Sequence, residues 1–478
     1  MRGLLAGGAR AVPAAPSLRV GLARGPRAWR LAAVLLALLA ATALNGAIAV
    51  ESPAGPLADL THFKHWARLV TVDGMHAAYS GDYPETYAIY PPVTLVTFRL
   101  AGVAYQRLVD PTFDLDRALA SHTLAVLLRL VALGFHLLVG LAVLAVARQA
   151  VSFGAAYAAM LAYLFNPGAV FDVAQWGQPD PVFGLFVLLA VAAVAVAGDE
   201  RAALPRPWSL ITRRATVLGP AAAGLAIALA ALAKPQAWVY LPLVAALVWR
   251  RGGPVGLLAA GVAGAVGALL VALPFIVHGT LRELLGLPAA ISSVMPVVTA
   301  NAHNLWWAYS GGAARWYLDQ DPFVGPLSYR LVAVGIVGAC AGLALLRAVR
   351  EPTLGVAFAA AAYTAFGFFM GMTQIHENHM YAVFPLLAVA AAVDRRLWPI
   401  YGVLALTWCA NMLLHDFDLA EQVVAPLLPW SLEDAQRANG LIDVAVFAAW
   451  TAWLLAATAR AWLAPPAPRA AARATSEV

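Results

Sequence analysis

Long apolar runs dominate this sequence and restrict the folds that the chain can adopt. Stretches of about 20 mostly apolar residues, the length at which a helix crosses a bilayer, recur about a dozen times along the 478 residues. Hydrophobic residues make up 62% of the chain and charged residues only 12%, about half of the charged share of a typical soluble domain. These features exclude a soluble enzyme and predict an all-α polytopic membrane protein.

The positions of the runs predict about twelve transmembrane helices. One further stretch, 90–109, is apolar enough to be a thirteenth, and its placement decides on which side of the membrane all later loops lie. The twelve runs centre on 31–50, 121–147, 152–166, 181–198, 217–233, 236–250, 254–275, 329–347, 354–371, 378–393, 397–414 and 441–460.

The distribution of positive charge favours one of two topologies. If 90–109 lies at the membrane interface, 20 of the 31 Lys and Arg residues fall on the cytoplasmic side, ten fall outside, and Arg129 lies within a span. If 90–109 crosses the membrane, 13 fall inside and 16 outside. Because cytoplasmic loops carry the excess of Lys and Arg, we predict the first topology. It gives a multi-pass protein of the cell membrane with both termini in the cytoplasm.

The chain is expected to form a single transmembrane domain over 31–463. The first 30 residues contain six arginines and no acidic residue, a pattern that also opens a signal peptide. The apolar run that follows is longer than a signal core, which favours a retained first span. The Pro- and Ala-rich ends, 1–30 and 464–478, are expected to be disordered cytoplasmic tails. Two long outer segments, about 51–120 and 276–328, are expected to carry interfacial helices.

Five short polar motifs fall on the outer side in this topology. Polar groups at membrane depth are costly and are retained for a site or for internal hydrogen bonds, so motifs that gather on one face predict a site there. The motifs are Asp59 with His62 and Trp66 in DLTHFKHWARL, Tyr90 in YPP, Trp176 with Gln178 and Asp180 in WGQPD, Lys234 with Gln236 in KPQ, and His376, Glu377 and His379 in HENH.

The order of these motifs resembles that of the integral-membrane glycosyltransferases of the C-type (GT-C) fold. Over about residues 55–390, the chain is similar to the GPI-type bacterial mannosyltransferase-like proteins and to the eukaryotic dolichyl-phosphate-glucose glucosyltransferases of asparagine-linked glycosylation. The resemblance implies an inverting hexosyltransferase that moves mannose or glucose from a polyprenyl-phosphate donor. The acceptor would be a lipid-linked or cell-envelope glycan on the extracytoplasmic face, and no nucleic-acid partner is expected.

Asp59 has the position of the family's catalytic carboxylate. The resemblance implies that it acts as the general base that takes the proton of the acceptor hydroxyl. An Asp shortly after a span is alternatively a helix cap. The phosphate leaves already charged, so cations and not a general acid must stabilise it. Lys234 resembles a basic residue of a relative and is a candidate for this role, with an interfacial snorkelling lysine as the alternative.

Other residues are expected to bind the donor phosphate or its sugar. Arg129 lies inside a span, where an arginine faces the bundle interior or a cavity by default. His376 and Glu377 resemble the family's HE pair, and an interfacial hydrogen-bond network is the alternative. Trp176 suits stacking on a sugar and an aromatic belt equally. The donor-binding set is Lys234, Gln236, His376, Glu377, His379, Arg129, Trp176, Gln178 and Asp180.

A second set of residues is expected to face the acceptor or to shape the site. Tyr90, with the two prolines that follow it, is expected to form the turn into an interfacial helix, and Asn166-Pro167 is expected to end a helix. Loop polarity alone would also explain the two asparagines of the second outer segment. The set is His62, Trp66, Tyr90, Asn301 and Asn304.

No cofactor and no metal site are predicted. Asp114-Leu115-Asp116 and Asp416-Phe417-Asp418 are strings of the kind that binds divalent ions through oxygen atoms, so a divalent ion is the alternative. Neither string has the position of Asp59, and the surrounding FDLDRAL is typical of a helix N-terminus. Cys340 and Cys409 lie in apolar runs, which argues against a disulfide or a cysteine-bound metal.

Three other functions compete with this prediction. A transporter or flippase of lipid-linked sugars would also be polytopic, but such proteins usually show repeats and helix breaks at mid-membrane depth, and neither is evident here. A membrane scaffold would not need five polar motifs on one face. An oligosaccharyltransferase of the same fold usually has a sizeable soluble domain, for which this sequence offers no stretch.

Overall fold

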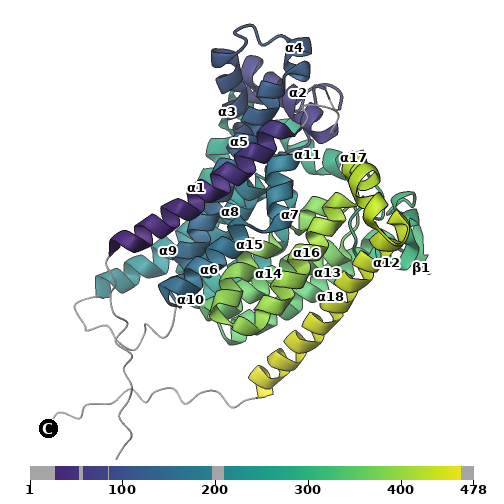
Figure 1. Ribbon diagram of the computed structural model, residues 1–478. Coiled ribbons are helices and arrows are strands. Elements are labelled where there is room, and N and C mark those ends of the chain that lie inside the picture. Colours follow the sequence, from purple (N-terminus) through teal and green to yellow (C-terminus); the bar gives the residue numbers. More distant parts are fainter. Residues whose placement is uncertain (1–26, 53–57, 84, 196–208, 464–478) are drawn as a thin grey trace, which may run out of the picture.

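The computed structural model describes residues 27–52, 58–83, 85–195 and 209–463, and almost all of their regular structure is helical (Figure 1). The described strands, β1 (Pro322–Val324) and β2 (Leu327–Ser328), form one short antiparallel hairpin. The chain is therefore an all-α polytopic membrane protein, as predicted. The expected tail 464–478 and most of the tail 1–30 lie outside the described residues.

Apolar helices form the bundle that occupies most of the molecule (Figure 1). Each of the twelve predicted apolar runs overlaps a helix of this bundle. The helices are α1 (Arg27–Glu51), α5 (His122–Ala147), α6 (Phe153–Leu164), α8 (Asp180–Val194), α9 (Ser209–Ala231), α10 (Leu241–Val277), α13 (Tyr329–Arg350), α14 (Leu354–Gly371), α15 (Val383–Val393), α16 (Trp398–Leu413) and α18 (Leu432–Leu463).

Within the described residues, six helical segments are long and apolar enough to cross a membrane, or seven if α6 and the segment after it form one bent span. The count of twelve crossings stays a prediction. The 48° bend after α6 falls at the Asn166-Pro167 pair. Asn166 caps α7 (Pro167–Val170) by accepting a hydrogen bond from the Ala169 amide. The predicted helix end at this pair is confirmed.

Helix α10 contains most of the predicted run 236–250 and all of the run 254–275. Gly253 lies between them with φ 58° and ψ −148°, a conformation that glycine adopts without the steric cost of a Cβ atom. Val244 from the first half and Ala260 from the second half line one groove against α9. The chain therefore turns at Gly253, and both halves pack against the same helix.

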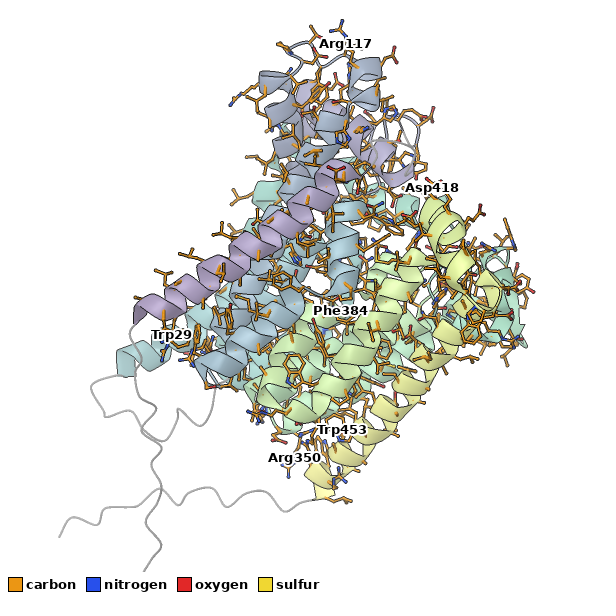
Figure 2. The ribbon with its side chains drawn as sticks, in the orientation of Figure 1. Trp29, Arg117, Arg350, Phe384, Asp418 and Trp453 are labelled. Carbon is orange, nitrogen blue, oxygen red and sulfur yellow. The ribbon has the colours of Figure 1, made fainter. Side chains whose placement is uncertain are left out.

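Helix α15 lies at the centre of the bundle, with Phe384 near its start (Figure 2). Every residue from Val383 to Ala392 is buried, because other helices surround this one. Its neighbours are α5, α6, α14 and α16. The polar residues just before α15 are thereby fixed to a rigid element.

The first outer segment forms a helical cap at one end of the bundle (Figure 1). Phe63, Trp66, Phe98 and Tyr105 are among the buried residues that join α2 to α3. The YPP motif starts α3 at Pro92 with Pro91 as its N-cap, as predicted. The elements of the segment are α2 (Ala58–Val72), η1 (Met75–Ala77), α3 (Pro92–Leu108) and α4 (Leu115–Ala120).

The remaining described elements connect the bundle helices or belong to the second long segment, about 276–328. They are η2 (Phe171–Gln175), η5 (Pro235–Tyr240), α11 (Leu281–Val294), α12 (Leu305–Ser310), η6 (Gly311–Arg315), η7 (Glu377–Met380), η8 (Arg395–Leu397), α17 (Phe417–Leu419), η9 (Ala420–Val424) and η10 (Ala425–Leu427).

The predicted topology has a direct test in cysteine accessibility. Arg395→Cys and Asp418→Cys replace exposed residues. Arg395 precedes Arg396, which lines a cavity together with Trp453, and Figure 2 shows Trp453 and Asp418 at opposite ends of the bundle. In a Cys340→Ala/Cys409→Ala background, we expect an impermeant maleimide added to intact cells to label the cysteine at position 418 and to reach the one at position 395 only after permeabilisation. Direct labelling at position 395 in intact cells would contradict the topology.

Candidate functional site

All five motifs meet through side-chain hydrogen bonds at one end of the bundle. They come from α2, from the turn before α3, from the segment that leads into α8, and from the turn between α9 and η5; η7 adds a fifth element. The linked residues are Asp59, Tyr90, Gln178, Asp180, Lys234 and Asn378. The predicted convergence of these motifs is therefore visible in the contacts themselves.

Asp59 is the second residue of α2, and its side chain is held by a different segment. Its carboxylate Oδ2 accepts a hydrogen bond of 2.6 Å from Gln178 Nε2, while Asp59 itself is exposed. A carboxylate in the first turn of a helix is favoured by the helix dipole. The structure thus presents a carboxylate that is oriented by a neighbour and accessible to a reactant.

The orientation of the Gln178 amide follows from its two partners. Burial and the nearby Asp180 and Asp59 carboxylates raise the pKa of the Tyr90 phenol well above its usual value. The phenol therefore keeps its proton and donates to Gln178 Oε1 at 3.0 Å. The amide nitrogen is then directed to Asp59, which as a carboxylate can only accept. Tyr90, Gln178 and Asp59 form one ordered chain of hydrogen bonds.

Asp180 and Lys234 form a buried ion pair beside this chain. Asn378 donates a second hydrogen bond of 2.8 Å to Asp180 Oδ2. Lys234 is 5% exposed, and its ammonium lies 5.8 Å from the centroid of the Tyr90 ring. The snorkelling alternative for Lys234 is therefore wrong, because the side chain points into the protein.

The HENH motif lies at the edge of the same site. The His376 backbone pairs with Ala300 and Asn301 of the second outer segment, and its amide donates to His379 Nδ1 at 3.3 Å. Burial lowers the pKa of the His376 imidazole, an effect that the Asp59 charge partly opposes and the Lys234 charge increases. His376 therefore offers a neutral ring that can donate a hydrogen bond and that an added negative charge would help to protonate.

The Glu377 backbone carbonyl accepts from the Trp408 indole at 2.9 Å, which fixes η7 to α16. The Glu377 side chain is buried, and its Oε2 has no hydrogen-bond partner in the described residues. Gln236, the last residue of the KPQ motif, likewise has a buried side-chain oxygen without a partner there. Both oxygens therefore have unused hydrogen-bonding capacity among the described residues.

Arg129, which is expected to bind the donor, has backbone carbonyls as its described partners. It is fully buried, and its guanidinium donates to the backbone carbonyls of Ala49, Ser52 and Gln175. These contacts join the end of α1 to η2. His136 on the same helix lies close to the Leu164 carbonyl and takes no part in the site. Arg129 is placed to position the segment that leads to Gln178.

Trp176 belongs to the packing of the site and not to its surface. Its ring is 9% exposed, packs edge-to-face on Phe171, and donates through its indole N–H to Asp416 at 3.3 Å. This buried environment fits neither a ring that stacks on a sugar nor a residue of an aromatic belt. Gly177, the next residue, has φ 73°, a left-handed conformation that favours glycine and lets the chain turn between Trp176 and Gln178.

The predicted acceptor-side residues fall into two groups. His62 faces the site from α2, where its ring lies 5.8 Å from Trp66 and 5.4 Å from Tyr83. Burial lowers the pKa of His62, and Asp59 partly opposes this effect. Trp66 is 1% exposed and is part of the apolar core of the cap. It can shape the site but has no surface for an acceptor.

The two asparagines of the second outer segment differ in role. Asn304 is fully buried and caps α12, where its side chain accepts from the Trp306 and Trp307 amides. This is a structural function of the kind that short polar residues serve at helix starts. Asn301 has φ 70°, and its carbonyl accepts from Asn411. Through its backbone pairing with His376, Asn301 lies at the edge of the site.

The DxD strings have structural contacts. Asp114 caps α4 by accepting from the Arg117 amide, which confirms the expected helix N-terminus. Asp416 accepts from the Leu419 amide and from Trp176. Among the described residues, no three His, Cys, Asp or Glu side chains are arranged to hold a metal ion.

Two residues near the site were not selected from the sequence. Asn378 holds Asp180, and Asp172 in η2 is fully buried with no hydrogen-bond partner for either carboxylate oxygen in the described residues. An acid that follows an apolar stretch is the signal that could have found Asp172. In the sequence, nothing distinguished Asn378 from the other residues of the HENH motif.

Neither the sequence models of known families nor the curated protein sequences match this chain. Its fold, however, is similar to solved structures. ArnT from Cupriavidus metallidurans bound to undecaprenyl phosphate aligns with a TM-score of 0.50 at 17% identity, over 91% of this chain and 78% of that one. In its apo state the same protein aligns with a TM-score of 0.47 at 16% identity, over 90% and 77% of the two chains. The oligosaccharyltransferase AglB from Archaeoglobus fulgidus aligns with a TM-score of 0.41 at 12% identity, over 93% of this chain and 57% of that one.

The first of these similarities covers most of both chains. It agrees with the all-α polytopic architecture of the described residues. The chain has the GT-C fold of integral-membrane glycosyltransferases.

Proposed function

We propose that this protein is an inverting glycosyltransferase that uses a polyprenyl-phosphate sugar as donor. The observation that carries the proposal is the exposed Asp59 carboxylate, oriented by Gln178 and Tyr90, beside the buried Asp180–Lys234 pair. The resemblance of ArnT, whose structure contains undecaprenyl phosphate, agrees with such a donor. A scaffold has no use for an oriented, accessible carboxylate of this kind.

In the proposed reaction, the acceptor hydroxyl oxygen attacks C1 of the sugar from the side opposite to the phosphate. Asp59 takes the hydroxyl proton as the new C1–O bond forms. The bond between C1 and the phosphate oxygen breaks, and its electron pair leaves with the polyprenyl phosphate. The single displacement inverts the configuration at C1 and requires no general acid.

The leaving phosphate gains negative charge, which nearby donors and cations stabilise. Lys234 supplies a fixed positive charge, and His376 supplies an N–H at the edge of the site. Glu377, His379, Gln236 and Gln178 are proposed to bind the donor sugar, with Asp180 and Asn378 holding Lys234 in place. His62, Tyr90 and Asn301 are proposed to line the approach of the acceptor.

The finer assignments rest on the resemblance of the motifs to the mannosyl- and glucosyltransferases of this fold. They give a hexose, mannose or glucose, as the transferred sugar and a lipid-linked or cell-envelope glycan as the acceptor. The arginine distribution favours the extracytoplasmic face as the side of the reaction. Residues 31–463, with their transmembrane helices, would then form one catalytic domain.

The test is transfer in isolated cell membranes that contain the protein together with the endogenous glycan acceptors, supplied with one radiolabelled polyprenyl-phosphate sugar at a time. We expect label from a mannose or glucose donor to appear in a glycan fraction with inverted linkage, and not from the pentose or amino-sugar donors of the same panel. Movement of the labelled lipid between leaflets without transfer to any acceptor would contradict the proposal and favour a flippase.

A further inference from the structure

A second site candidate lies at the other end of the bundle from Asp59. A cavity of about 470 Å³ opens there between the ends of α13, α14 and α15 and the side of α18. Helix α15 begins shortly after Glu377 and ends at Val393 in the cavity wall. Arg350 and Trp453 mark this end of the molecule in Figure 2, and Asp418 marks the opposite one. The cavity is therefore separate from the proposed active site.

The rim of the cavity is electropositive. Arg347, Arg396 and Arg460 line it, with Glu351 and Asp394 as the acidic residues. The cations exceed the acids by one. Helix α14 also starts here, capped by Thr353, and the N-terminus of an 18-residue helix adds partial positive charge.

One arginine of the rim has unused hydrogen-bonding capacity. Arg347 forms an ion pair with Glu351 through Nη2 at 2.6 Å, but its Nη1 is buried and has no hydrogen-bond partner among the described residues. Arg396, in contrast, donates hydrogen bonds to Asp394 from both Nε and Nη2, and its side chain is largely exposed. A buried donor without a partner is costly, so an acceptor group in this cavity would relieve that cost.

Below the rim the cavity wall is apolar. Val356, Ala359 and Ala360 from α14 face Leu454 and Ala457 from α18. From Thr353 to Ala360 the helix rises by about 10 Å, which is deep enough to cover the upper part of an acyl chain. A free phosphate would have no use for this wall, whereas an amphiphile would contact rim and wall together.

We propose that this cavity binds the phosphodiester headgroup of an anionic membrane phospholipid. Arg347 and Arg460 donate to the phosphate oxygens from two helices, and the apolar wall covers the first carbons of one acyl chain. Binding ties α18 to α13 and α14 at this membrane surface. The site goes beyond the proposed glycosyl transfer and does not depend on it.

The test is lipid retention by the detergent-purified full chain in native mass spectrometry. We expect dioleoylphosphatidylglycerol to be retained over dioleoylphosphatidylcholine. Arg347→Gln/Arg460→Gln should reduce that preference by about a hundredfold, since it removes two charge-assisted hydrogen bonds that each contribute about tenfold. Arg395→Gln, an exposed arginine at the same end that does not line the cavity, is the matched control and should leave the preference unchanged.

A second variant tests the cavity without changing its charge. Ala457→Phe fills the apolar wall and should also abolish the preference for the anionic lipid. Equal retention of the two lipids by the wild type would overturn the proposal, as would a double arginine variant that behaves like Arg395→Gln. Displacement of the lipid by inorganic phosphate at millimolar concentration would identify a free-phosphate site and would also overturn it.

Discussion

Asp59→Asn is expected to lower glycosyl transfer by a factor on the order of 10²–10⁴, the usual contribution of a general base. The asparagine has nearly the same size and can keep a hydrogen bond to Gln178, but it cannot take the proton of the acceptor hydroxyl. Because Asp59 is exposed, expression and thermal stability should stay near those of the wild type. The measurement is the initial rate of transfer at saturating donor, together with donor binding.

Asp73→Asn is the matched control, since it removes a second carboxylate shortly after the same helix, where Asp73 lies 3.8 Å from Arg68. It should leave the rate of transfer unchanged. A wild-type rate for Asp59→Asn would contradict the assignment of Asp59 as the general base. Asp180 and Glu377 would then be the next carboxylates to test.

Lys234→Met is expected to reduce both stability and donor use. It leaves the Asp180 carboxylate buried without its cation, and breaking one side of a buried ion pair costs about 3–5 kcal/mol. We expect a clear fall of the melting temperature in detergent. Transfer should fall as well, because the leaving phosphate loses the charge that stabilises it.

The double variant Lys234→Met/Asp180→Asn separates these two effects. It removes both charges, and the new amide at position 180 could still accept from Asn378, so much of the stability should return while transfer stays low. His376→Ala, at a half-exposed site, should weaken donor use with a smaller change in stability. Recovery of transfer in the double variant would show that Lys234 acts only on folding and not on the donor.

The sequence contained enough information for the helices, because a run of apolar residues must be enclosed by protein or lipid and must satisfy its own backbone. The breaks at Asn166-Pro167 and at Pro91-Pro92 were also predictable, because a proline inside a helix removes a backbone hydrogen bond and interrupts the helix. The convergence of the motifs followed from topology alone: alternate helix ends lie on the same side.

The pairing inside the site could not be predicted in this way. Lys234 reaches Asp180 across 54 residues, and Asn378 reaches it across 198; such partners are selected by the packing of whole helices. The same packing buries Trp176 and leaves Asp59 exposed, although both lie in polar motifs. Residue type thus indicated where the site is, and three-dimensional contacts were needed to distinguish reacting groups from supporting ones.

The hydrogen bond from Gln178 to Asp59 has a consequence for the entropy of the reaction. A free aspartate on a protein surface samples several rotamers, and binding an acceptor would have to select one of them at a cost in affinity. Here the amide already restricts the carboxylate when the site is empty, so that loss of freedom occurs during folding. It also occupies Oδ2, so in the proposed reaction Oδ1 is the oxygen left to receive the proton. Each acceptor therefore meets a carboxylate with the same oxygen directed to it.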